Sequence, residues 1–110
     1  MTAANAYCVI LVTASSPAEA RRIGRALLKK RLVACVNMLP GVESQYWWQG
    51  KIERSRECLM MMKTRRGRFA AIERAVKQLH SYSVPEIIAV PLVAGQRDYL
   101  RWMDVSLADR

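Results

Sequence analysis

Histidine and paired cysteines are scarce in this chain of 110 residues. There is one histidine, His80, and the three cysteines at positions 8, 35 and 58 show no C-x-x-C spacing. A hydrolase triad would have to use that single histidine, and no G-x-S-x-G motif accompanies it. A structural zinc site needs about four Cys or His ligands, and an odd number of cysteines inside apolar runs argues against a disulfide framework. We therefore expect a protein that is not an enzyme and whose cysteines are buried and free.

Long apolar runs and targeting segments are missing as well. No run approaches the roughly 18 apolar residues of a membrane span, and residues 1–6 lack the basic start and apolar core of a secretory signal. The sequence therefore predicts no membrane insertion and a cytoplasmic location. Yet 52% of the residues are hydrophobic, which is high for a single small domain. We expect one domain over residues 1–110 that associates with copies of itself.

Acidic residues are few. The chain has 9 Asp and Glu and 18 Lys and Arg, which gives a formal net charge of +9. Such a charge can attract a phosphate backbone. The basic residues concentrate in 21–31 and 63–68, where no aromatic side chains are interleaved to stack on bases. The pattern favours a solvated basic surface and predicts no nucleic-acid partner.

The first half of the chain alternates between strand and helix signals. Residues 7–13 form an apolar run typical of a strand, and Ser16-Pro17-Ala18-Glu19 is typical of a helix start. The helix stripe is Ala20, Ile23, Gly24 and Leu27. Strand signals return at 33–39 and 42–48, with Pro40-Gly41 bending the chain between them.

The second half contains the return strand and two more helices. Residues 49–51 predict a hairpin turn, and the strand at 52–64 is so long that the hairpin should project beyond the body of the subunit. A short loop at 64–67 should lead into a helix whose apolar stripe starts at Phe69, and a strand at 87–90 follows. A last helix begins near position 96, with Tyr99, Trp102, Met103 and Ser106 expected on one side.

This order of elements predicts an α+β protein, a ferredoxin-like split βαβ sandwich with an extra C-terminal helix. In that fold two helices cover one face of a four-stranded antiparallel sheet. The other face is bare in a single subunit. Because the strands read as nearly continuous apolar runs, we expect the second face to be buried by self-association.

Five segments of the chain together resemble one family. They are Val33 to Gly41 with Tyr46 to Glu53, then Met60 to Thr64, then Tyr82-Ser83-Val84-Pro85-Glu86, then Asp98 to Trp102. In order and spacing they are similar to the CutA proteins, the family associated with tolerance to divalent cations. The resemblance implies a homotrimer with sheets facing one another around a threefold axis. It also implies copper or another divalent cation as the candidate cofactor.

The metal expectation centres on His80, because a neutral imidazole can ligate copper or zinc. Where copper ligands have been proposed for CutA proteins, they include a cysteine in the first strand and a histidine pair before the tyrosine. This chain has Val12 and Leu79-His80 at those places, so any copper binding should be weak. A lone exposed histidine that complements the helix dipole is the competing interpretation. Cys35, Glu57 and Glu86 of adjoining subunits are the alternative ligands.

A second expectation is a small-ligand site. Trp48, Lys63, Tyr82 and Glu86 match recurrent CutA positions that flank clefts between subunits, and an ion-paired structural network is the alternative interpretation. Trp47 and Trp48 should face opposite ways on their strand, which suits an interface anchor. Met60 and Met62 share a face but lie too far apart for a thioether copper site, so we expect them in the core.

The resemblance leaves a rival function open. A PII-like signalling protein would share the fold and the trimer and would bind a small ligand at the subunit clefts. The short aromatic hairpin favours an interface over a mobile signalling loop. Single-stranded RNA binding on the sheet would need exposed aromatics in the third strand, where residues 56–63 offer Cys, Leu and Met instead.

Overall fold

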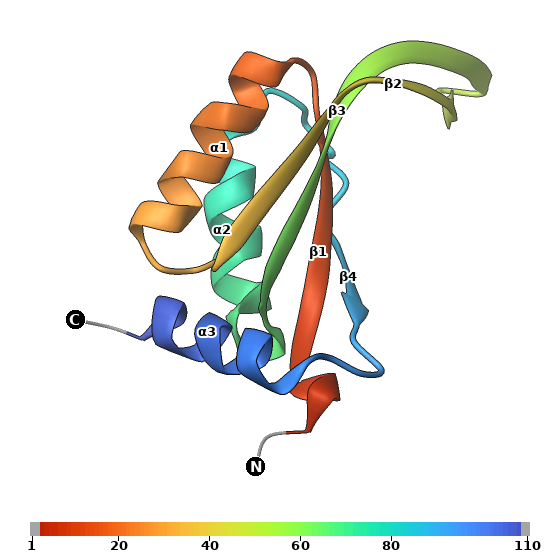
Figure 1. Cartoon of the computed structure of the whole chain (residues 1–110). Helices are drawn as coiled ribbons and strands as arrows, with labels where there is room; N and C mark the ends of the chain where they lie inside the picture. The colour runs from red at the N-terminus through yellow and green to blue at the C-terminus, as the bar shows by residue number, and fades with distance from the viewer. Residues whose placement is uncertain (1–2, 109–110) are drawn as a thin grey trace.

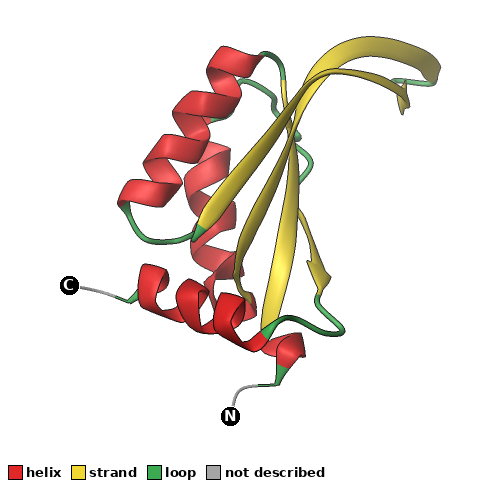
Figure 2. Cartoon of the chain, in the orientation of Figure 1, coloured by secondary structure: helices red, strands yellow, loops and turns green. Residues whose placement is uncertain are grey.

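The computed structural model describes residues 3–108 (Figure 1). Its elements are β1 (Tyr7–Ala14), α1 (Pro17–Lys29), β2 (Cys35–Trp48), β3 (Lys51–Arg65), α2 (Phe69–Leu79), β4 (Ile88–Pro91) and α3 (Arg97–Leu107), with 3₁₀ turns at Ala4–Ala6 and Arg66–Arg68. All strand pairs are antiparallel, and the sheet order is β2-β3-β1-β4. The helices α1 and α2 lie on the same face of the sheet (Figure 2). The predicted ferredoxin-like sandwich with an added C-terminal helix is confirmed.

The start of α1 shows how the local sequence sets an element. The Ser16 hydroxyl accepts a hydrogen bond from the Glu19 backbone N–H at 3.1 Å, and Pro17 occupies the first helical turn. The helix buries the predicted stripe of Ala20, Ile23, Gly24 and Leu27 against the sheet. Gly24 permits close packing, because a Cβ there would lie only 3.2 Å from a methyl group of Val36.

The core lies between the two helices and one face of the sheet. Alternate residues of β1 and β3 point into it and are fully buried: Cys8, Ile10, Val12, Ala14, Cys58, Met60 and Met62. Ile72 and Val76 of α2 pack against these strand residues from the helix side. Met60 and Met62 are therefore core residues, as predicted, and their thioethers are buried.

The opposite face of the sheet has no helix over it within residues 3–108 (Figure 2). Successive side chains of a strand point to opposite faces, so this face carries the residues that alternate with the core residues. They are largely apolar: Val9, Leu11, Leu39, Leu59, Met61, Ile88 and Val90. Leu39, Ile88 and Val90 are each about half exposed, at 47%, 50% and 48%. We call this surface the open face.

The β2–β3 hairpin extends past the helices and arches away from them (Figure 1). Its turn uses Gln49 and Gly50 with φ of 51° and 79°, the two left-handed residues that a tight type I′ hairpin requires. Nearer the body, Leu39 pairs with Leu59 and Val42 with Glu57, so Pro40 and Gly41 together stand opposite one residue. This bulge bends β2, and Gly41 adopts a φ of 73° there.

The C-terminal helix buries only part of the predicted side, on which the Tyr99 and Trp102 rings pack together. α3 buries Leu100, Met103 and Leu107, whereas Tyr99 and Trp102 are exposed. Leu100 and Met103 pack with Tyr7, and the Asp104 carboxylate accepts hydrogen bonds from the Tyr7 hydroxyl and the Arg65 guanidinium, both at 2.8 Å. Among residues 3–108, no helix is both long and apolar enough to cross a membrane.

Two local expectations were wrong. The predicted loop at 64–67 does not begin at 64, because Arg65 still pairs with Tyr7 before the 3₁₀ turn Arg66–Arg68. Cys35 is half-buried instead of buried, because it opens the edge strand β2 on the open face; Cys8 and Cys58 are buried, and all three cysteines are free.

Candidate functional site

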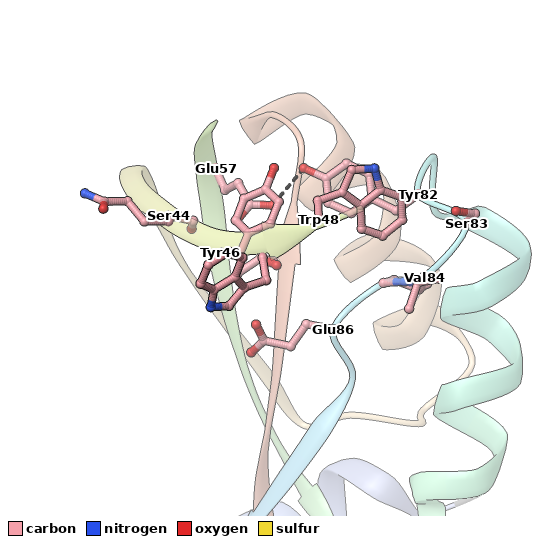
Figure 3. Close-up of a pocket in the computed structure, with 12 residues that line it drawn as sticks. Ser44, Tyr46, Trp48, Glu57, Tyr82, Ser83, Val84 and Glu86 are labelled. Atoms are coloured by element: carbon pink, nitrogen blue, oxygen red, sulfur yellow. Dashed lines mark hydrogen bonds between the residues drawn. The ribbon is translucent and has the colours of Figure 1, made fainter. Parts of the chain in front are cut away.

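A pocket of about 690 Å³ lies where the bent part of β2 faces the segment between α2 and β4 (Figure 3). Its walls combine aromatic side chains, two carboxylates and small polar or apolar groups: Tyr46, Trp47, Trp48, Tyr82, Glu57, Glu86, Thr13, Ser44, Gln45, Ser83, Val84 and Pro85. Thr13 follows Leu11 by two residues on β1, and Glu57 precedes Leu59 by two residues on β3, so the pocket continues the open face toward the hairpin. Its volume suits a small organic molecule.

Glu57 and Tyr82 form the polar pair of the pocket. The Tyr82 hydroxyl donates a 2.7 Å hydrogen bond to Oε2 of Glu57, which the dashed line in Figure 3 marks. Glu57 is only 7% exposed although it lines the pocket. Burial, together with the hydrogen bond and the charge of Glu57, raises the pKa of Tyr82 above its ordinary value. Tyr82 therefore stays protonated and acts as a donor to the carboxylate.

Glu86 is the second carboxylate, and it reaches the pocket from the segment that follows Pro85. Burial raises its pKa above the ordinary value, and the nearby charge of Glu57 raises it further. The ionised form of Glu86 is therefore disfavoured beside the Glu57 carboxylate. A positive charge placed between the two carboxylates would lower the free-energy cost of ionising Glu86.

His80 ends α2 and is buried, at 8% exposed, so the expectation of an exposed histidine is wrong. Its Nδ1 accepts the backbone N–H of Tyr82 at 3.0 Å, which leaves the ring proton on Nε2. Nε2 then donates to the backbone carbonyl of Thr13 at 2.8 Å. His80 thus joins the pocket segment to β1 and holds Tyr82 in place.

Glu19 supports the same segment from α1 and is 3% exposed. Its carboxylate accepts hydrogen bonds from the backbone N–H and hydroxyl of Ser15 and from the backbone N–H of Ser81, each at 2.8 Å. Burial by itself would raise the pKa of Glu19, but these hydrogen bonds outweigh it and lower the pKa to about 2. Glu19 is therefore a charged structural anchor for the start of the pocket segment.

The structure brings together three of the four predicted ligand residues. Trp48, Tyr82 and Glu86 line one pocket. Lys63 does not line it, because it lies farther along β3 on the open face, where its Nζ donates a 2.6 Å hydrogen bond to Oδ1 of Asn37. Within one subunit Lys63 is thus separate from the pocket.

A metal at His80 does not fit this geometry. Coordination at either ring nitrogen would break a hydrogen bond of a buried group. The part of the chain that the structure describes contains no cluster of three or more His, Cys, Asp or Glu side chains placed to hold a metal ion. The pair Glu57 and Glu86 supplies oxygen ligands, but two carboxylates are few for a tight divalent site.

Some pocket residues were not foreseen as ligand residues. Tyr46 belongs to a segment that resembles the family, Trp47 is interpreted with Trp48 as an interface anchor, and Glu57 is considered only as a metal ligand of adjoining subunits. The bulge at Pro40-Gly41 is what bends their strand toward Tyr82. The sequence marked the bend without specifying its direction.

The sequence and the fold both match known proteins. The profile of the CutA1 divalent ion tolerance protein matches residues 8–106. The divalent-cation tolerance protein CutA of Thermus thermophilus is 45% identical over 86% of this chain and 92% of its own length.

Solved structures agree with the sequence comparisons. The periplasmic divalent cation tolerance protein CutA from Archaeoglobus fulgidus has a TM-score of 0.90 at 43% identity, covering 93% of this chain and 99% of its own. CutA1 from Oryza sativa has a TM-score of 0.90 at 38% identity, covering 94% and 95%. The molecule is thus a ferredoxin-like protein of the divalent-cation tolerance class. More specifically, the chain belongs to the CutA1 family.

Proposed function

We propose that this chain acts in divalent-cation tolerance as a non-enzymatic cytosolic homotrimer that binds a small ligand in the pocket of Trp48, Tyr82 and Glu86. The observation that carries the proposal is the convergence of aromatic side chains and two carboxylates in one concave site. Such a combination of apolar walls and a few polar groups is typical of ligand sites.

The open face supports the homotrimer. The apolar side chains of this face make a contiguous surface: Leu39, Ile88, Val90, Leu11, Leu59 and Met61. A surface of this kind marks an interface more often than it faces water. Three copies arranged around an axis would cover these faces.

A binding role is favoured over a catalytic one by how the reactive side chains are engaged. His80 uses both ring nitrogens on backbone groups, and Glu57 already accepts the Tyr82 hydroxyl. Neither is poised to take a proton from a nucleophile in the pocket. The site can hold and orient a ligand without any chemical step.

The contribution to cation tolerance is proposed to work through the bound ligand. His80 does not fit copper, and Glu57 with Glu86 would hold a hard divalent cation only weakly. The protein would accordingly respond to metal stress by binding and assembly instead of sequestering copper or another divalent cation in a tight site.

Native mass spectrometry tests the proposal in one measurement. The chain is purified without a chelating tag, and metal content is measured in parallel. We expect a trimer mass with substoichiometric metal, and a small organic ligand that is retained by the parent and lost from Trp48→Ala. A monomer mass, or stoichiometric tightly bound metal, would contradict the proposal.

A further inference from the structure

The charge of the pocket is opposite to the charge of the molecule. The chain carries +9, yet the two ionisable acids Glu57 and Glu86 line the pocket and no Lys, Arg or His does. Charges on the rest of the surface are screened over about 8 Å at physiological salt. A ligand inside the pocket therefore meets the carboxylates first, and these favour a cation.

The walls of the pocket add a second preference. Tyr46, Trp47, Trp48 and Tyr82 line it, which is half of the aromatic side chains in the chain. The face of an aromatic ring attracts a cation, most strongly for tryptophan, and the same face tolerates the apolar substituents of an organic ammonium. A hydrated metal ion would gain little from these rings.

The two carboxylates are also arranged to need a counter-charge. Glu57 is 7% exposed, and its only hydrogen-bond donor among the described side chains is the neutral Tyr82 hydroxyl. Neither Glu57 nor Glu86 forms a salt bridge among the described residues, although Arg56 adjoins Glu57 in β3. Two other basic residues of the hairpin are engaged elsewhere: Arg54 lies 3.9 Å from Glu43, and Lys63 bonds Asn37. Burial raises the pKa of Glu86, and the negative charge of Glu57 raises it further.

We propose that the ligand of this pocket is an organic cation, a substituted ammonium that stacks on the aromatic wall and neutralises Glu57 and Glu86. This inference rests on the proposed function and specifies its ligand class. It excludes nucleotides such as ATP, whose phosphates the carboxylates would repel. It also separates the chain from a PII-like protein regulated by an anionic ligand.

Choline and 3,3-dimethylbutan-1-ol test the inference directly, because they share a shape and differ in the positive charge. Binding of both, and of ATP, is measured on the full chain by calorimetry and by ligand-observed NMR. We expect choline to bind at least about tenfold more tightly than the neutral alcohol, and ATP not to compete. Equal affinity for the two isosteres, tighter binding of ATP, or no choline binding at millimolar concentration would overturn the inference.

Charge variants locate the effect. Glu57→Gln keeps an acceptor for Tyr82 and removes the charge, and Glu86→Gln does the same at the second position. Each should weaken choline binding about tenfold while leaving the weak binding of the alcohol unchanged. Glu53→Gln is the matched control, because it removes one charge from the same hairpin outside the pocket and should leave choline affinity unchanged. An equal loss in the control would reduce the effect to net charge and overturn the inference.

The outcomes separate this inference from the proposed function. If the alcohol or ATP binds and Trp48→Ala abolishes that binding, the pocket is a ligand site and only the ligand class is wrong. If no probe binds and the ligand found by native mass spectrometry survives Trp48→Ala, both are wrong.

Discussion

The two faces of the sheet differ in what covers them, although they are built from the same strands. Val12 points into the helices and is fully buried, whereas Leu11 beside it lies on the open face and is only partly buried. Both side chains are aliphatic, so hydrophobicity alone does not distinguish a subunit core from a subunit interface. What distinguishes them is the connection: α1 and α2 both return over the same face.

The largest effect should come from a charge on the covered face. Val12→Glu would bury an unpaired carboxylate among Ile23, Met60 and other core side chains, at a cost of several kcal/mol. That is comparable with the whole stability of a small domain. We expect loss of folded protein, measured by circular dichroism. A cooperative melt close to that of the parent would contradict the assignment of this face as the core.

The same substitution one residue earlier should have a different result. Leu11→Glu would put the charge on the open face. Water can solvate this charge in a single subunit, but in an assembly the charges of facing copies would repel one another. We expect a folded protein whose mass by light scattering falls from three subunits to one. Ala18→Glu on the exposed first turn of α1 is the control and should keep the trimer. A Leu11→Glu trimer would refute the open face as an interface.

A smaller effect is expected at the buried charge of Glu19. Its folded pKa of about 2 lies below its ordinary value of 4.5, so its stabilisation is complete above about 4.5 and is lost as pH falls through about 2. Glu19→Gln should lower the free energy of unfolding by up to about 3 kcal/mol at neutral pH. Chemical denaturation at several pH values would show parent and variant converging toward pH 2. A difference that is constant with pH would mean that the charge is unimportant.

The smallest effect concerns copper. His80→Ala removes two hydrogen bonds and should cost about 1 to 3 kcal/mol of stability, because Tyr82 N–H and the Thr13 carbonyl lose their partner. Calorimetry with Cu(II) should show weak binding in the parent that the substitution leaves unchanged. Loss of copper affinity without loss of stability would instead make His80 a ligand.

Most of the fold could be predicted, because it depends on local signals. The Ser16-Pro17 helix start, the stripe from Ala20 to Leu27 and the hairpin turn at Gln49-Gly50 each arise from neighbouring residues. The packing of α3 could not be predicted in the same way. Its buried residues Leu100 and Met103 pack with Tyr7, and Asp104 bonds Tyr7 and Arg65, which are distant in the sequence.

The site was less predictable for the same reason. Trp48, Tyr82 and Glu86 were foreseen through family resemblance, and they do share a pocket. The burial of His80 depends on the Thr13 carbonyl, 67 positions away, and no pattern around residue 80 indicates it. From sequence alone, a histidine that follows a helix is predicted to be exposed, because the strand that packs against it is not known.

The shape of the pocket depends on the number of residues in the β2 bulge between Leu39 and Val42. Because Pro40 and Gly41 stand opposite one residue, deleting Gly41 would keep every strand pair and remove only the bend. Tyr46 and Trp48 would then move away from Tyr82 on a straighter hairpin. Such a protein should retain its melting temperature and its oligomer mass but lose choline affinity. Two homologues that differ by a single residue at this point could thus share a fold and an assembly and differ in whether they have a binding site at all.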